Sequence, residues 1–432
     1  MFDTIVIGGG MAGIVAARDL AAGGHSVVLL DGRNRLGGRV FTDTVLGSRL
    51  DLGGGYVHWT QANVWRELQR YGLDKTLKAP LSPEKLYWLA DGKVHQQENA
   101  NRHGLAEPLL KRMLGDARLL FPTPFDPHVD GHPNLEDETL ADRIDKLQLS
   151  PYDRDVLEGA LAGLVHDFSL HGVLQMLHGV STHMGQVLSY LEVTGTWSCE
   201  SGIGELVSAI SADSHATVQM GAAVTEISDE DGSHVSVTTI DGRTIHAKAA
   251  VVAIPINTLA HVKISPPLPA AVAQMVQDRN PVKASKLWAL VKGHVAPFAA
   301  MAPPGKHPIN AIRVERRWGD NTLVLCMCAD ADAVPFGDSQ VTAVQAALRK
   351  FVPEIDVLEV AGHDWNRDPF SRGGWMMHRP RHFIKGVAAL MEPHGRIYFA
   401  GSDVTATNTG FIEGAMSSGA AAARAILRKY CH

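Results

Sequence analysis

The sequence predicts an α/β fold with a parallel sheet, and three observations lead to this class. An apolar strand over residues 2–7 is followed by glycines spaced G-x-G-x-x-G and by a small-residue helix over 11–22. A second apolar strand, 26–30, ends on an acid 18 residues after the last of these glycines, near the ~20 typical of a dinucleotide-binding βαβ unit. An apolar strand over 251–254 and a strand, loop and helix over 395–427 later return to the same sheet.

Each residue of the first turn has a separate task in such a unit. Gly8 permits the tight turn, Gly10 lets the backbone approach a pyrophosphate, and Gly13 lets the helix pack closely on the strand. The helix N-terminus faces the phosphates, and Asp31 can accept a hydrogen bond from a ribose hydroxyl. We therefore expect a dinucleotide here rather than an ordinary glycine-rich loop.

The residues after Asp31 narrow the kind of dinucleotide. Arg33, Arg35 and Arg39 belong to a run R-x-R-x-G-G-R, which a simple nicotinamide site does not need. Its adjacent glycines let a loop lie flat on a ligand, and its arginines can neutralise phosphates through forked hydrogen bonds. A solvated basic turn is the alternative interpretation of the run.

Composition excludes several classes of function. Of the 432 residues, 45% are hydrophobic and 20% charged, and the formal net charge of −6 gives no reason to expect nucleic acid or an anionic membrane as a partner. No apolar run reaches the ~18 residues of a membrane span, and neither a signal peptide nor a membrane-anchoring tail is expected. The 21 histidines show no metal-ligand spacing, so we expect no metal site.

The cysteines indicate a reducing compartment. Cys199, Cys326, Cys328 and Cys431 show no disulfide framework, and a cytoplasmic location fits best. Cys326 and Cys328 lie two residues apart on one predicted strand, so they share a face and are expected to be packing residues.

The order of the predicted elements indicates a cofactor domain that is interrupted twice. The cofactor domain comprises residues 1–75, 200–265 and 385–432, and the substrate domain comprises residues 76–199 and 266–384. The first interruption is predicted to be a helical insertion, with Ser150 and Pro151 starting one of its helices. The second is predicted to hold strands over 286–291, 309–314 and 322–329 and a helix over 341–351.

Four stretches carry motifs of a known family. They are the N-terminal turn through Arg39, Leu52 to Gln61 (LGGGYVHWTQ), Trp365 to Trp375 (WNRDPFSRGGW) and Phe399 to Ala415 (FAGSDVTATNTGFIEGA). Together they resemble the flavin amine oxidase family, which includes the monoamine oxidases, polyamine oxidases and L-amino-acid oxidases. The resemblance covers nearly the whole chain. It implies a discontinuous Rossmann-like FAD-binding domain of the glutathione-reductase type, interleaved with an α+β substrate domain.

The resemblance also implies which residues contact FAD. They are Gly8, Gly10, Met11, Ala12, Gly13, Asp31, Gly32, Arg33, Gly38, Arg39, Gly54, Gly55, Tyr56, Val224, Trp365, Gly401, Ser402, Asp403, Gly410, Phe411 and Ile412. In the monoamine oxidases a cysteine bonds covalently to the flavin. Gly374 stands at that place in this chain, so non-covalent FAD is expected.

Four residues are implied as catalytic. The tyrosine pair that forms an aromatic cage in the family becomes Trp375 and Phe411, two flat faces that would orient an amine. Lys286 lies on an apolar strand where relatives hold a lysine that is hydrogen-bonded through water to flavin N5 and would assist reoxidation by dioxygen. His58 stands where many members have glycine, which would place an imidazole near the flavin edge.

The implied reaction is the FAD-dependent oxidation of a small-molecule amine. Hydride passes to flavin N5, water hydrolyses the resulting imine or iminium, and dioxygen is reduced to hydrogen peroxide. Within the family the chain is similar to the bacterial 6-hydroxynicotine oxidases at Gly401 to Val404 (GSDV), His363 to Trp365 (HDW) and Trp375. This similarity favours a cyclic secondary or tertiary amine such as 6-hydroxynicotine, as in nicotine degradation.

Other functions stay open on the sequence alone. A primary monoamine or polyamine is the runner-up substrate, and an L-amino-acid oxidase would need an arginine on the carboxylate, for which Arg313 or Arg316 is available. A non-enzymatic flavin-fold protein of the Rab GDP-dissociation-inhibitor type is the alternative from another class. His166 and Gln175 could line the substrate pocket but are explained equally well by packing, and a homodimer is compatible with the sequence.

Overall fold

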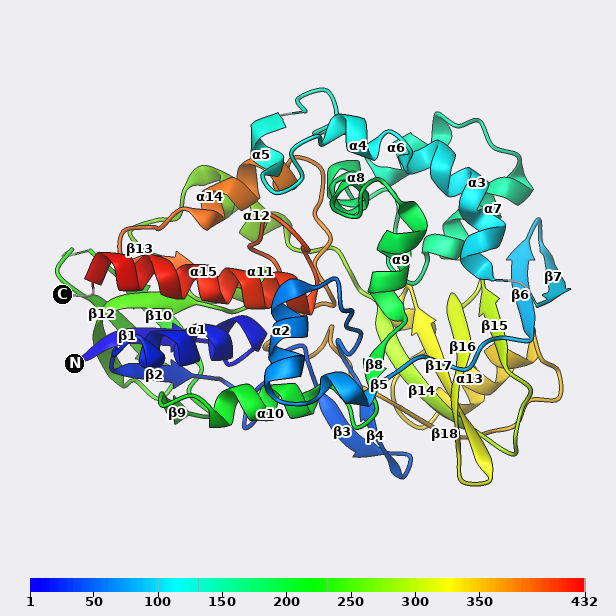
Figure 1. The fold of residues 1–432 in the computed structure, drawn as a ribbon, viewed down its shortest axis with the longest axis horizontal. Helices are drawn as coiled ribbons and strands as arrows, with labels where there is room; N and C mark the ends of the chain where they lie inside the picture. Colours follow the sequence, from blue (N-terminus) through cyan, green and yellow to red (C-terminus); the bar gives the residue numbers. More distant parts are fainter. Residues whose placement is uncertain (100, 131, 231, 431–432) are drawn as a thin grey trace.

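Two β-sheets lie towards opposite ends of an elongated molecule, and helices from the second hundred residues cover their junction (Figure 1). The computed structural model describes residues 1–99, 101–130, 132–230 and 232–430. The first strand and the last helix both belong to the end that holds the first sheet.

The first sheet has β1 at its centre. β1 (Phe2–Ile7) pairs in parallel with β2 (Val27–Leu30) on one side and β12 (Thr244–Val252) on the other. The remaining strands are β9 (Thr217–Gln219), β10 (Val224–Ser228), β11 (Val235–Thr239), β13 (Lys263–Ser265) and β19 (Ile397–Phe399). β9 and β19 extend the parallel part, while β10, β11 and β12 form an antiparallel meander. The predicted α/β class is confirmed.

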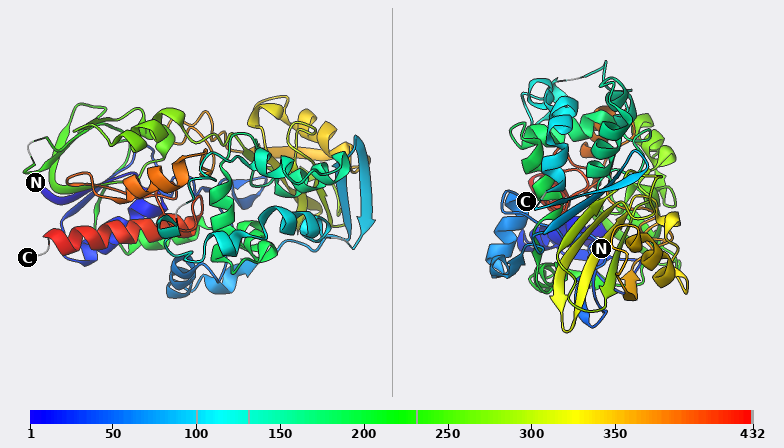
Figure 2. Two further views of the ribbon diagram at one scale, coloured as in Figure 1. Left: turned by 90° about the horizontal axis from the view of Figure 1, so that it is seen from above. Right: turned by 90° about the vertical axis from the view of Figure 1, so that its right-hand side faces the viewer.

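Side chains of β1 alternate between two buried faces, each covered by helices (Figure 2). On the Val6 side lie α1 (Met11–Ala22), α2 (Ala62–Arg70), α10 (Gly204–Ala212) and α15 (Ile412–Tyr430). On the Ile5 side lie α11 (Ile256–Leu259), α12 (Ala270–Asp278) and α14 (Val387–Met391). α1 and α15 approach so closely that a Cβ on Gly419 would lie 2.2 Å from the Ala12 carbonyl oxygen. Burial on both faces explains why β2 and the second half of β1, residues 5–7, are uniformly apolar.

The second sheet is built mainly from the second predicted interruption. Its order is β18-β14-β17-β16-β15-β6-β7. The strands are β6 (Lys85–Ala90), β7 (Lys93–Glu98), β14 (Ser285–Val291), β15 (Phe298–Met301), β16 (Ala311–Trp318), β17 (Asn321–Cys328) and β18 (Val357–Gly362), and α13 (Gln340–Arg349) packs against β18. Each sheet draws its strands from segments assigned to one predicted domain, although the domain boundaries themselves stay predictions.

The predicted helical insertion over 76–199 also contains strands, which the prediction did not include. β6 and β7 form a hairpin whose turn residues, Asp91 and Gly92, have φ of 50° and 71°. Short strands β5 (Leu77–Lys78) and β8 (Ser198–Cys199) also pair at the two ends of the segment. The Asp-Gly dipeptide between apolar runs is a strong hairpin signal, because both turn residues need positive φ.

The helical part of the insertion packs over the second sheet and the junction. Its helices are α3 (Arg102–Leu114), α4 (Ala117–Leu120), α5 (Pro127–Asp130), α6 (Leu140–Asp145), α7 (Pro151–Leu161), α8 (Val173–Thr182) and α9 (Val187–Gly195). α7 starts as predicted, because the Ser150 hydroxyl accepts a hydrogen bond from the Asp153 N–H at 3.1 Å. Leu157 and Leu161 of this helix are fully buried against β6.

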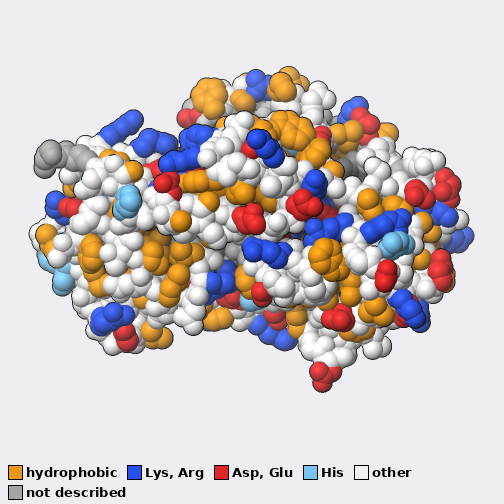
Figure 3. All heavy atoms as spheres, turned by 60° about the horizontal axis from the view of Figure 1, so that its bottom comes forward, with side chains coloured by type: hydrophobic (Ala, Val, Ile, Leu, Met, Phe, Trp, Pro, Cys, Tyr) orange, Lys and Arg blue, Asp and Glu red, His pale blue; other side chains and the backbone are white. Residues whose placement is uncertain are grey.

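The remaining features of the fold are a short hairpin, the buried cysteines and the character of the surface. A hairpin of β3 (Thr42–Val45) and β4 (Ser48–Asp51) leads from the N-terminal turn into the glycine run at 53–55. Cys326 and Cys328 are buried, as predicted, whereas Cys431 lies outside the described residues. Acidic and basic side chains are interspersed on the face shown in Figure 3. None of the helices described is long and apolar enough to cross a membrane.

Candidate active site

One continuous cavity of about 600 Å³ joins the two sheets. It begins at the carboxyl ends of β1 and β2, which is where open α/β sheets bind ligands, and it ends against β14, β16 and β17. All of the residues predicted to contact FAD line it except Gly13 and Asp403. The cavity therefore has a glycine-rich end on the first sheet and an apolar, aromatic end on the second.

The N-terminal turn has the geometry that a bound dinucleotide requires. Gly8 has φ of +98°, and a Cβ on Gly13 would lie 1.9 Å from the Gly8 carbonyl oxygen, so neither position admits a side chain. A Cβ on Gly10, in contrast, would meet nothing closer than 3.9 Å, because this residue borders the cavity. Gly10 also begins α1, whose first turn carries no acidic residue and no side-chain cap, so its N–H groups suit a phosphate.

Asp31 is buried at the end of β2 and lines the same end of the cavity. Its Oδ2 accepts a hydrogen bond from the Gly9 N–H at 2.7 Å, and its Oδ1 accepts one from the Arg33 N–H at 2.7 Å. These bonds fix the carboxylate and leave each oxygen a second lone pair. A ribose hydroxyl could donate to it, so the predicted role of Asp31 is compatible with its position.

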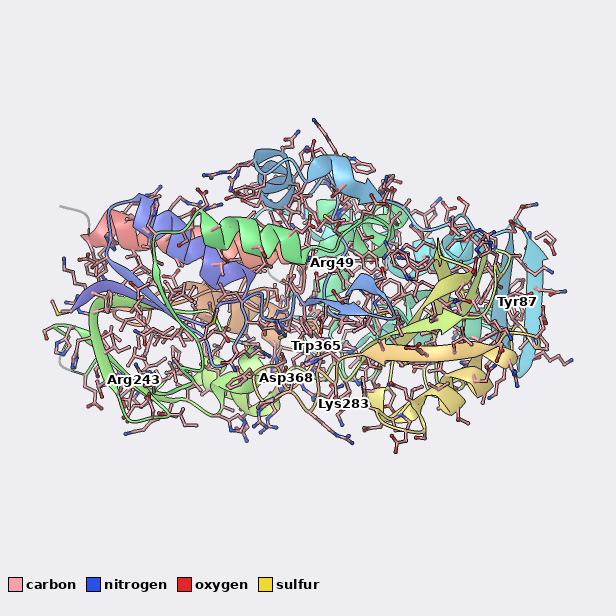
Figure 4. The ribbon with its side chains drawn as sticks, turned by 90° about the horizontal axis from the view of Figure 1, so that it is seen from below. Arg49, Tyr87, Arg243, Lys283, Trp365 and Asp368 are labelled. Atoms are coloured by element: carbon pink, nitrogen blue, oxygen red, sulfur yellow. The ribbon has the colours of Figure 1, made fainter. Side chains whose placement is uncertain are left out.

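The arginines that follow Asp31 all have hydrogen-bond partners within the protein. Arg33 donates to Asp368 at 2.6 Å, and Figure 4 shows Asp368 beside Trp365 where the two sheets meet. Arg35 does not line the cavity; its guanidinium lies 4.0 Å from the Phe41 ring centroid and donates to the Gly38 carbonyl oxygen. Arg35 thus has its partners inside the protein, whereas Arg33 lines the cavity and already has a carboxylate partner.

Arg39 connects three distant segments. Its Nη2 donates to Asp403 at 2.5 Å and to the Ser402 hydroxyl at 2.9 Å, and its Nη1 donates to the Gly374 carbonyl oxygen at 3.0 Å. The Asp403 side chain is only 3% exposed and also accepts from the Ile256 N–H. Burial alone would raise the pKa of Asp403, but the charge and hydrogen bond of Arg39 lower it below its ordinary value. Asp403 thus holds the cavity wall together without lining it.

The glycine run after β4 places the cavity wall against the second sheet. A Cβ on Gly53 would lie 2.1 Å from the Arg39 carbonyl oxygen, so only glycine fits there. The Lys286 Nζ donates to the Gly53 carbonyl oxygen at 3.1 Å, and the Trp365 indole N–H donates to the Leu52 carbonyl oxygen at 2.9 Å. Both bonds would be missed by sequence reasoning, because their partners are backbone atoms.

Lys286 is buried at the aromatic end of the cavity. Its Nζ lies 4.8 Å from the ring centroid of Tyr56 and 5.3 Å from that of Trp288. Burial lowers the pKa of Lys286 to about 8, although the charges of Asp51 and Glu315 act in the opposite direction. Lys286 is thus a buried cavity-lining amine with a lowered pKa, and its predicted role near flavin N5 stays a prediction.

Trp375 and Phe411 line the same end of the cavity. The indole N–H of Trp375 donates to the Leu164 carbonyl oxygen at 2.9 Å, which fixes the ring. Phe411 makes an edge contact with Tyr190, whose ring centroid is 6.4 Å away. Tyr190 also lines the cavity and was not predicted; no local motif distinguishes it from other apolar positions on α9.

His58 does not line the cavity, and its predicted place near the flavin edge stays a prediction. Its ring stacks on Trp59 at 3.9 Å between centroids, and its Nδ1 lies 2.7 Å from the Thr60 hydroxyl. Its Nε2 lies 3.7 Å from the carboxylate of Glu192 on α9. The imidazole therefore has its contacts with Trp59, Thr60 and Glu192 outside the cavity.

The two residues left open by the sequence have different positions. Gln175 lines the cavity, but its amide is fully used, since it donates to the Met376 carbonyl oxygen and accepts from the His378 N–H. His166 does not line the cavity, and its Nδ1 lies 3.1 Å from the Nε2 of His171. No group of three His, Cys, Asp or Glu side chains among the described residues could hold a metal ion.

Comparisons with known proteins agree on one family. Residues 11–427 match the family model described as flavin containing amine oxidoreductase. A pseudooxynicotine dehydrogenase from Pseudomonas sp is 32% identical over 97% of this chain and 84% of its own length. An (S)-6-hydroxynicotine oxidase from Paenarthrobacter nicotinovorans is 31% identical over 99% of this chain and 100% of its own length. The cyclohexylamine oxidase from Brevibacterium oxydans IH-35A has the same fold, with a TM-score of 0.78 at 19% identity over 99% of each chain.

Proposed function

We propose, because the chain belongs to the family of flavin-containing amine oxidoreductases, that it oxidises a cyclic secondary or tertiary amine of the 6-hydroxynicotine type. The observation that carries the proposal is a convergence. Lys286, Trp375 and Phe411 come from three distant segments and line one apolar compartment that is continuous with the dinucleotide cradle. The chain is an FAD-dependent amine oxidase by family, and the proposal concerns its substrate and electron acceptor.

The residues that line the cavity would hold FAD along its length. The N–H groups at the start of α1 would face the pyrophosphate, Asp31 the ribose, and Gly54, Gly55 and Phe411 the far end. Bound there, FAD would supply an acceptor for the hydride that the amine loses. No described cysteine lines the cavity, so the flavin would be held without a covalent bond.

The chain itself prepares the amine. Trp375 and Phe411 present flat faces that orient a small apolar amine, and the surrounding apolar residues exclude water. Excluding water favours the neutral amine, which has the lone pair that oxidation requires. The Lys286 cation adds to this preference, because a second positive charge in the same compartment is unfavourable.

The residues that line the cavity favour some classes of amine over others. Among the described lining residues the only carboxylate is Asp31, which lies at the dinucleotide end. A polyamine would bring a second ammonium group with no anion to meet it, so polyamines are disfavoured. The names of the two relatives point to nicotine-type amines, and family membership gives no support to a Rab GDP-dissociation-inhibitor type of function.

A panel of cyclic amines, primary monoamines and L-amino acids tests the proposal. Under nitrogen, only a substrate should bleach the flavin absorbance, and we expect cyclic secondary or tertiary amines to do so fastest. Bleaching by amino acids alone would contradict the substrate class. Admitting air then tests the acceptor: rapid recolouring with release of hydrogen peroxide supports an oxidase, whereas slow recolouring supports a dehydrogenase, the activity named for the Pseudomonas relative.

The Gly10→Val variant should fold but lose FAD. Since a Cβ at this position meets nothing closer than 3.9 Å, the fold should tolerate the side chain, with a cost near the ~1 kcal/mol typical of changing a helix N-cap. The branched side chain would nevertheless fill the space that a pyrophosphate needs. Circular dichroism and the ratio of visible to ultraviolet absorbance measure the two effects. A variant that binds FAD as well as the wild type would contradict this placement.

Acid precipitation of the purified protein should release all of its flavin into the supernatant. Gly374 carries no thiol, and Cys199, Cys326 and Cys328 are buried away from the cavity. The supernatant absorbance, compared with that of the intact protein, measures the released fraction. Yellow colour that stays with the washed precipitate would show a covalent bond and reject the non-covalent assignment.

A further inference from the structure

We propose that Arg313 selects the substrate by binding an uncharged hydrogen-bond acceptor, a carbonyl oxygen or an aromatic ring nitrogen, on the part of the amine remote from the oxidised nitrogen. This inference rests on the proposed function and names its substrate class more closely. It starts from the second sheet, where Arg313 lines the aromatic end of the cavity on β16.

Strand register places Arg313 at a distance from Lys286 that a small amine can span. Lys286 pairs with Met327 on β17, and Met327 pairs with Ala311 on β16. Arg313 is two residues further along β16, so it shares the cavity face, and its Cα lies roughly 12 Å from that of Lys286, from the spacing of strands and of residues along them. The charged groups are closer than that, because the Lys286 Nζ and the Arg313 Cζ lie 4.8 Å and 5.0 Å from the centroid of the same Tyr56 ring. A substrate whose nitrogen is near Lys286 could therefore reach Arg313 with its other end.

The guanidinium of Arg313 is held but not fully used. Its Nε donates to Glu315 at 2.8 Å, its Nη1 donates to the Gly195 carbonyl oxygen, and its plane lies 5.0 Å from the Tyr56 ring centroid. Its Nη2 and the Tyr56 hydroxyl are buried without a hydrogen-bond partner among the described residues. The Tyr56 hydroxyl and the Arg313 guanidinium lie close enough to act on each other's pKa, but they form no hydrogen bond of regular geometry. Burying an unpaired donor is costly, so a ligand acceptor that pairs with Nη2 would gain binding energy.

The neighbouring carboxylate decides the charge of the acceptor. Glu315 is paired with Arg313 and is itself buried, so the pair carries no net charge. A substrate carboxylate at Arg313 would lie beside the Glu315 carboxylate, and the repulsion would offset the hydrogen bond. A carbonyl oxygen or a ring nitrogen meets no such penalty. This disfavours L-amino acids, and Arg316 offers no other clamp, because it does not line the cavity and donates to Ser48 instead.

The test compares two secondary amines of equal length, one with an aryl ketone and one with a methylene group at the same place. The wild type should have a kcat/KM about 10-fold or more higher for the ketone, the effect of one hydrogen bond to a charged group. In Arg313→Met this preference should fall to within about threefold. Arg316→Met, on the same strand but outside the cavity, should keep the wild-type preference. An unchanged preference in Arg313→Met would overturn the proposal.

Two further measurements keep the outcome clear. If neither amine reduces the flavin, the proposed reaction fails, but binding of the same pair under nitrogen, followed by the fluorescence of Trp375 and its neighbours, still tests Arg313. Glu315→Gln leaves the Arg313 charge uncompensated, so it should raise affinity for an amine with a carboxylate about 10-fold relative to the ketone amine. If this affinity does not rise in Glu315→Gln, the inference that the acceptor is uncharged is wrong. If Arg313→Met does not fold, Arg313→Lys should show a reduced preference, since an ammonium cannot keep all three partners.

Discussion

Lys286→Met should slow reoxidation of the reduced protein by dioxygen about 100-fold while FAD stays bound, the size of effect seen when one preorganised group that stabilises developing negative charge is removed. Reduction of dioxygen builds negative charge on oxygen. Lys286 is a buried cation held by the Gly53 carbonyl oxygen at 3.1 Å, so water screens it little. Methionine keeps the length and apolar character of the side chain but removes the charge.

Stopped-flow mixing of the photoreduced protein with aerated buffer measures this rate directly. Lys283→Met is the matched control, because Lys283 lies on the same segment but is exposed and does not line the cavity. The control should reoxidise at the wild-type rate. Reoxidation of Lys286→Met at that same rate would reject the role assigned to Lys286.

The same rate should depend on pH in the wild type. Burial lowers the pKa of Lys286 from its ordinary value of 10.5 to about 8, so the cation is lost as pH rises through about 8 rather than above 10. Reoxidation should therefore slow across this range in the wild type and stay flat in Lys286→Met. A wild-type rate that is constant up to pH 10 would mean that another group provides the charge.

Arg39→Met should lower the free energy of unfolding by about 3–5 kcal/mol and weaken FAD binding, the effect expected when one partner of a buried ion pair is removed. Arg39 is the only described cation hydrogen-bonded to the Asp403 carboxylate, and it also holds the Gly374 carbonyl oxygen. Methionine would leave Asp403 charged and buried, and it would release the wall that carries Trp375. Urea unfolding followed by circular dichroism measures the loss.

A double variant separates the charge from the packing. Arg39→Met combined with Asp403→Asn should recover a large part of the lost stability, because no buried charge remains unpaired. In the single variant an unpaired carboxylate in a buried site has a raised pKa, so protonation favours the folded state and the stability deficit should shrink as pH falls. A deficit that is independent of pH and unaffected by the second substitution would contradict this explanation.

Short contiguous sequence patterns were sufficient to predict the cofactor end of the cavity. The turn at Gly8 and Gly13 could be predicted because the positive φ at Gly8 and the close approach at Gly13 leave no alternative residue. Lys286 could be singled out for a similar reason, since a lysine on an apolar strand is costly unless it has a function. In the same way Ser150 and Pro151, an N-cap residue followed by a proline at the first helical position, predicted the start of α7.

The missed features are of a different kind. The β6–β7 hairpin has a local signal, Asp91-Gly92, that was outweighed by the helical patterns around it. Glu413 has none: its carboxylate accepts from the N–H groups of Asn63 and Val64 at the start of α2, which lie about 350 residues earlier in the chain. The His58 imidazole lies 3.7 Å from the Glu192 carboxylate on α9, a contact that no local pattern predicts.

Short-range sequence patterns thus determined the dinucleotide cradle, the parallel sheet and the family. They could do so because backbone geometry restricts which residues can stand at a few neighbouring positions. The Arg313–Glu315 pair joins residues only two apart on β16. Which charges from distant segments meet was instead decided by packing: Arg33 reaches Asp368 across 335 residues and Arg39 reaches Asp403 across 364. Such pairings depend on how two sheets are held together, and nothing in the spacing of residues along the chain encodes that distance.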